Sequence, residues 1–73
     1  MTFLPVITPK KLAATLKRSG FFLDRQHGSH AIYKHPDGRR TVIPMHAKDL
    51  PPGTLKAILH DIDTSIEELK EQL

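Results

Sequence analysis

Apolar and polar residues repeat along this chain with a helical period near both ends and a strand period between them. In the first segment, three apolar residues recur on one helical face: Leu12, Ala13 and Leu16. Thr8 is a candidate N-cap, and Pro9 has the backbone geometry that suits the first helical position. Gly20 accepts the left-handed conformation in which many helices end. We therefore predict a helix over residues 9–19, after an irregular lead-in at residues 1–7.

The middle of the chain has the short apolar runs and turn residues that are typical of strands. Three strands are predicted, at residues 21–26, 29–34 and 40–45. Gly28 permits a turn or a bulge between the first two, and the run HPDGR indicates a turn before the third. Strand alternation places His30, Ile32 and Lys34 on the side of the second strand opposite to Tyr33. Three antiparallel strands in succession form a meander.

The clearest helical stripe follows the run PPGT: Leu55, Ile58, Leu59 and Ile62. Ser65 and Glu68 have the spacing of a capping box, which predicts a short helix over residues 65–73. The order α-β-β-β-α predicts an α+β fold, in which the helices pack on one face of a three-stranded antiparallel sheet. The other face of the sheet would then be open to solvent or to a partner.

The length of 73 residues is enough for one domain, with a core expected over about residues 7–62. The chain has no cysteine, which excludes disulfides and thiolate metal sites. It has no run of about 18 apolar residues, and its first residues lack the basic segment of a signal peptide. We therefore expect a soluble cytoplasmic protein without a membrane segment.

The net charge of +3 is distributed unevenly. Residues 1–60 contain ten Lys or Arg and three Asp or Glu, whereas residues 61–73 contain one Lys and five acidic residues. A cationic body of this kind attracts nucleic acid through the release of counterions. Basic residues also keep small domains soluble, so charge alone leaves both interpretations open.

Three of the five histidines lie close together in the sequence, and three interpretations of them are open. As metal ligands they would have to converge, but an unbroken strand places His30 on the side opposite to His27 and His35. A bulge at Gly28 could overturn this argument for His27, but not for His35. We therefore expect no metal and no other cofactor. As structural residues, histidines are common both on surfaces and in interiors, which is the expectation for His35 and His60. His46 follows the third strand and could turn toward the sheet.

The third interpretation is catalysis. RNA carries its own nucleophile, the 2′-hydroxyl, so a ribonuclease needs only proton transfer and the stabilisation of charge on phosphate. Histidine titrates near neutral pH and can serve as base or acid. On this interpretation His30 is the candidate catalytic residue. The candidate RNA-binding residues lie on or beside the strands: Arg25, Gln26, Lys34, Arg39 and Arg40.

Several linked motifs resemble the HicA toxin family of bacterial and archaeal toxin–antitoxin pairs. They are the runs RQHGSHAIY, VIPMH and DLPPGTLKAIL, preceded by TPKKLAATLKRSGFF. The resemblance covers about residues 7–62 and implies a fold like that of a double-stranded RNA-binding domain. It also implies an endoribonuclease that cleaves messenger RNA without the ribosome. The catalytic histidine of the family lies in its Gly-Ser-His motif, which corresponds to His30, with Gly28 and Ser29 as the backbone that positions it.

The resemblance further implies a partner, a HicB antitoxin that covers the active surface, with oligomers formed through the antitoxin complex. One departure from the family lies before Gly-Ser-His, where relatives often have lysine and this chain has His27. This change could weaken contact with phosphate or supply a second proton carrier.

Two alternatives to a ribonuclease stay open on the sequence. The first is a non-catalytic RNA-binding module of the same fold, which recognises RNA by its shape. The second is a pure interaction protein whose cationic face receives an acidic antitoxin.

Overall fold

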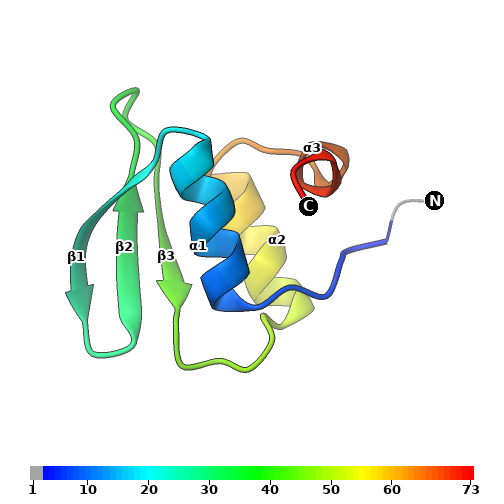
Figure 1. Ribbon diagram of the computed structural model, residues 1–73, viewed down its shortest axis with the longest axis horizontal. Coiled ribbons are helices and arrows are strands. Elements are labelled where there is room, and N and C mark those ends of the chain that lie inside the picture. Colours follow the sequence, from blue (N-terminus) through cyan, green and yellow to red (C-terminus); the bar gives the residue numbers. More distant parts are fainter. Residues whose placement is uncertain (1–2) are drawn as a thin grey trace.

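Two helices cover one face of a three-stranded sheet, and a third helix packs against them on the side away from the sheet (Figure 1). This arrangement is seen in a computed structural model, which describes residues 3–73. The elements in chain order are α1 (Pro9–Arg18), β1 (Phe22–His27), β2 (His30–Lys34), β3 (Arg40–Pro44), α2 (Pro52–Asp61) and α3 (Ile66–Glu71). The strand order is β1-β2-β3, and both pairs are antiparallel. The predicted α+β fold is confirmed.

Local sequence signals set the ends of the helices. The Thr8 hydroxyl accepts a hydrogen bond from the Lys11 backbone N–H at 3.2 Å, as expected of an N-cap. Gly20 has a φ of +94°, which permits the turn that ends α1. Ser65 and Glu68 form both hydrogen bonds of the capping box, each at 3.0 Å. Of the predicted irregular lead-in, residues 3–7 form no helix or strand, and residues 1–2 lie outside the described part of the chain.

The hydrophobic core lies between the sheet and the three helices. Its largest fully buried side chains come from the segment before α1, from one strand and from all three helices: Ile7, Leu12, Leu16, Ile43, Leu55, Ile58 and Leu69. Thr41 is also buried in β3, and its hydroxyl donates to Asp61 Oδ2 at 2.9 Å, which ties the strand to the end of α2. Burial of a polar side chain is tolerated here because the hydroxyl is hydrogen-bonded.

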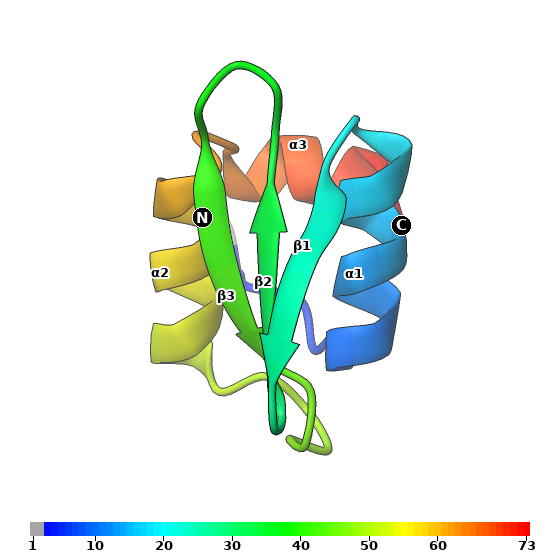
Figure 2. The same ribbon diagram turned by 90° about the vertical axis from the view of Figure 1, so that its left-hand side faces the viewer.

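The opposite face of the sheet has no helix or loop over it within residues 3–73. Figure 2 looks directly onto this face, with α1 and α2 behind the strands. None of the helices in the same residues is long and apolar enough to cross a membrane. Because this face of the sheet is uncovered, the side chains that the strands direct away from the core are the first candidates for a functional site.

Candidate nucleic-acid interface

A two-residue turn presents His30 at the start of β2. Gly28 in this turn has a φ of +58°, whereas Ser29 does not have a positive φ. A positive φ at the first central residue alone is typical of a type II′ turn, whose twist suits a hairpin. The turn pairs His30 with His27 of β1. Since Ala31 is buried on the helical side, His30 faces the uncovered side of the sheet, where it is exposed.

The prediction that His27 and His30 face apart is wrong. It assumed one continuous strand, whereas the chain reverses direction at Gly28 and antiparallel partners direct their side chains to the same face. His35 does lie apart from them, at the other end of β2. Its half-buried ring packs edge-on against Phe21, with the ring centres 5.0 Å apart. Within residues 3–73, no three metal-binding side chains form a group that could hold an ion.

Three of the five predicted RNA-binding residues share the uncovered face with His30. Ile32 and Lys34 lie two and four residues after His30 in β2, so their side chains face the same side of the sheet. Their strand partners, Arg25 and Arg40, therefore face that side as well. A bulge in β1 between residues 23 and 25 shifts the register there. The resulting surface has a shallow hollow, lined by Asp24, Arg25, His27, Ile32, Lys34 and Arg40.

Asp24 organises two of these cations. Its carboxylate lies 3.1 Å from Arg25 Nε and 3.3 Å from Lys34 Nζ. Partial desolvation opposes ionisation of Asp24, but the hydrogen bonds and charges of Arg25 and Lys34 outweigh it and lower the pKa of the carboxyl. The carboxylate therefore stays ionised and holds both cations beside the hollow. The pattern of residues along the sequence did not indicate that Asp24 pairs with both Arg25 and Lys34.

Gln26 lies on the other face of the sheet from His30. It is paired with Ala31, which is buried toward the helices. Its side-chain amide donates to the Gly28 carbonyl at 3.0 Å, so it supports the turn rather than the hollow.

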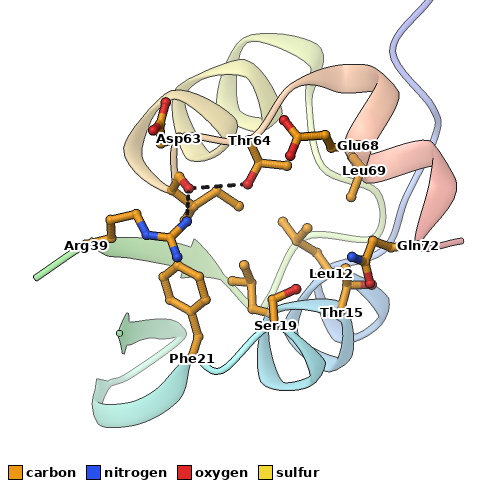
Figure 3. A pocket seen from close by; sticks show the side chains of 12 residues that line it. Leu12, Thr15, Ser19, Phe21, Arg39, Asp63, Thr64, Glu68, Leu69 and Gln72 are labelled. Carbon is orange, nitrogen blue, oxygen red and sulfur yellow. Dashed lines mark hydrogen bonds between the residues drawn. The ribbon is translucent and has the colours of Figure 1, made fainter. Parts of the chain in front are cut away.

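Arg39 also points toward the helical layer. Its Nε donates to Asp37 Oδ2 at 2.8 Å, and another guanidinium nitrogen donates to the Ile62 carbonyl. The guanidinium also lies over the Phe21 ring, 5.0 Å from its centre. Figure 3 shows Arg39 against Phe21, with its hydrogen bond to the residue after α2 as a dashed line. Both side chains line a cavity of about 190 Å³, together with residues of α1, α3 and the loop between α2 and α3. The structure does not bring Gln26 and Arg39 together with His30.

The structure does bring His46 to His30. Their ring centres are 6.4 Å apart, and the rings are inclined at 72°. The loop after β3 and the turn between β1 and β2 lie at the same end of the sheet (Figures 1 and 2). His46 lies two residues beyond Pro44, the β3 partner of His30, so the strand order was the signal that could have indicated this proximity.

The positive φ of Gly28 leads to a stability prediction. A Cβ added there would meet no heavy atom within 4 Å, so Gly28→Ala tests backbone strain alone. A sparsely populated backbone conformation of this kind costs a residue other than glycine about 1–3 kcal/mol. We expect Gly28→Ala to lower the free energy of unfolding by about 1–3 kcal/mol, measured by urea denaturation.

Gly53 provides the matched control for this substitution. A Cβ at Gly53 also meets open space, but this residue lies in the first turn of α2 and has no positive φ. Gly53→Ala should be neutral or stabilise the protein by up to about 1 kcal/mol, because alanine favours the helix. Equal losses from the two substitutions would contradict the role of the turn.

A sequence model of the family described as HicA toxin of bacterial toxin–antitoxin systems matches residues 9–63. No curated protein matches the chain at a significant level of similarity. The matched residues include α1, the whole sheet and α2, and therefore the complete uncovered face with His30 and His46.

Proposed function

The chain belongs to the HicA toxin family of bacterial toxin–antitoxin systems, and from this premise we propose that it is an endoribonuclease that cleaves messenger RNA without the ribosome. The observation that carries the proposal is an exposed histidine, His30, on a sheet face that residues 3–73 leave uncovered. Because its substrate is messenger RNA, we expect the toxin to act in the cytoplasm.

The proposed reaction uses His30 for proton transfer. The 2′-oxygen of a ribose loses its proton and attacks the neighbouring phosphorus, and the bond from phosphorus to the 5′-oxygen breaks. A positioned histidine is the side chain most often used for proton transfer in catalysis, so His30 can accept or donate a proton in this step. Gly28 and Ser29 support it by forming the turn from which it projects.

The basic side chains of the same face would bind the RNA backbone. Arg25, Lys34 and Arg40 share the orientation of His30 by strand pairing, and phosphate contacts of this type position an RNA without reading its sequence. They also oppose the negative charge that grows on phosphate during the reaction. Arg39 and Gln26 are occupied on the other side of the sheet, which favours the first three as the RNA-binding set.

We also infer that a HicB-type antitoxin inhibits the toxin by covering this face, and that oligomers form through that complex. Three apolar side chains are accessible among the charged ones there, as expected of a surface that receives a protein partner: Phe22, Ile32 and Val42.

Incubation of the purified toxin with labelled RNA in EDTA tests the proposed activity. We expect cleavage in the presence of EDTA, because the proposed proton transfer by His30 uses no metal ion. The upstream fragments should end in a 2′,3′-cyclic phosphate, because the 2′-oxygen attacks the neighbouring phosphorus. Cleavage should weaken as salt is added, because phosphate contacts lose affinity at higher ionic strength. Retention of intact RNA would indicate a non-catalytic binding module. RNA that is neither retained nor cut would indicate a pure interaction protein, and either result would contradict the proposal.

A further inference from the structure

His30 and His46 approach each other from two different strands. His30 is the first residue of β2, and His46 follows the last residue of β3 after one intervening position. Both side chains are exposed. A separation of 6.4 Å between the ring centres is small enough for both imidazoles to contact one phosphodiester from two directions.

Backbone contacts hold the two histidines in this relation. The Met45 N–H donates to the Ser29 carbonyl at 2.6 Å, and each of these residues immediately precedes one of the histidines. The Ala47 N–H donates to the Pro44 carbonyl at 3.3 Å, which closes the turn around His46. The proximity is therefore built into the hairpin and the end of β3, and does not depend on flexible side chains alone.

We propose that His46 is a second catalytic residue, and that His30 and His46 act as an acid–base pair. This inference rests on the proposed ribonuclease function and deepens it. One imidazole takes the proton of the 2′-hydroxyl as the 2′-oxygen bonds to phosphorus. The bond between phosphorus and the 5′-oxygen breaks, and the other histidine, as imidazolium, gives its proton to that oxygen. The step needs no metal ion and no other reactant, and solvent then restores the two protonation states.

A sulfur substitution in the substrate separates catalysis by His46 from mere positioning of His30. The substrate is a short RNA that the wild-type toxin cuts at one mapped bond, with sulfur replacing the bridging 5′-oxygen at that bond. A thiolate departs without being protonated, so this RNA needs a general base but no general acid. A variant that lacks only the acid should cleave it well, whereas a variant that lacks the base should not.

The experiment compares His30→Ala and His46→Ala on the ordinary and the sulfur-containing RNA. Each variant should lose about 100-fold or more in cleavage rate on ordinary RNA. On the sulfur-containing RNA, one of the two should recover to within about tenfold of the wild-type toxin, and the other should not. His60→Ala is the matched control, because His60 is exposed on α2, on the helical side of the sheet. This variant should cleave both substrates normally. Thermal unfolding of each variant checks that the fold is unchanged.

Several outcomes would overturn the inference. If His46→Ala cleaved ordinary RNA at the wild-type rate while His30→Ala did not, His46 would have no catalytic role and the ribonuclease function would stand. If the sulfur-containing RNA rescued neither variant or both equally, His46 would at most position His30. His27→Ala is measured on both substrates as a further variant. If the sulfur-containing RNA rescued it in place of either of the other two, the acid–base pair would be formed by the histidines of the hairpin. Absence of cleavage by the wild-type toxin would instead overturn the proposed function itself.

Discussion

His30→Ala is expected to lower the rate of RNA cleavage by about 10² to 10⁴-fold, the usual contribution of one general acid or base. The toxin should also stop arresting growth when it is produced without its antitoxin. The variant should fold normally, because the ring is exposed on the uncovered face and takes no part in the core. The cleavage rate on a labelled RNA in EDTA, measured beside a thermal unfolding curve, provides both readouts.

The control variant His60→Ala shows whether the effect depends on where the imidazole lies or only on the loss of one histidine. It changes the same side chain at an exposed site on α2, away from the uncovered face, and should retain full activity. If His30→Ala cut RNA at the wild-type rate, His30 would not be the catalytic residue. The main reason to regard the uncovered face as the active surface would then be removed.

Leu69→Ala is expected to cause the largest loss of stability among the changes considered. Leu69 of α3 is 1% exposed and lies in the core. Removal of a buried leucine side chain costs about 2–5 kcal/mol, and more where the space cannot collapse. Leu69 also lines the cavity of about 190 Å³ beside Arg39, so its truncation enlarges an existing space (Figure 3).

The loss is large for a chain of this length, whose total stability is expected to be about 4–11 kcal/mol. We expect the midpoint of thermal unfolding, followed by circular dichroism, to fall by roughly 10 °C or more. Leu73→Ala is the matched control, because Leu73 is 47% exposed at the end of the chain and should change the midpoint little. A shift for Leu69→Ala as small as that for Leu73→Ala would show that α3 contributes little to the core.

This second prediction concerns a segment beyond the family match. The match ends at residue 63, whereas α3 spans Ile66–Glu71. Arg18 of α1 donates to the Gln72 carbonyl at 3.1 Å, so the end of the chain is tied to the first helix as well as to the core. Loss of stability in Leu69→Ala would therefore show that α3 is part of the folding unit of this toxin.

Elements whose signals lie within a few residues could be predicted from the sequence. The capping residues Thr8 and Ser65 and the turn before β3 depend on hydrogen bonds between near neighbours. The helical stripes identified the buried faces for the same reason, because a helix relates residues three and four apart without reference to the rest of the chain. Strand limits were less accurate: β1 begins at Phe22 and not at Phe21, whose side chain is buried before the strand.

The composition of the uncovered face depended on pairing between strands. Alternation within β2 was sufficient to place His30 and Lys34 on one side of the sheet. Whether His27 joined them depended on the turn at Gly28, and the bulge in β1 shifted its register before Arg25. A shift of one residue in register reverses the face of every side chain in a strand, so local sequence could not decide these positions.

Local sequence therefore determined the order of the elements and the buried stripes, because each depends on contacts within a short stretch of chain. The Gly-Ser-His motif and its resemblance to the family made His30 the catalytic candidate. The tertiary structure decided which side chains surround His30. It joined His27 and His46 to His30, gathered Arg25, Lys34 and Arg40 beside them, and turned Arg39 and Gln26 away. Those neighbours come from separate strands and loops, and only strand register and packing bring such residues together.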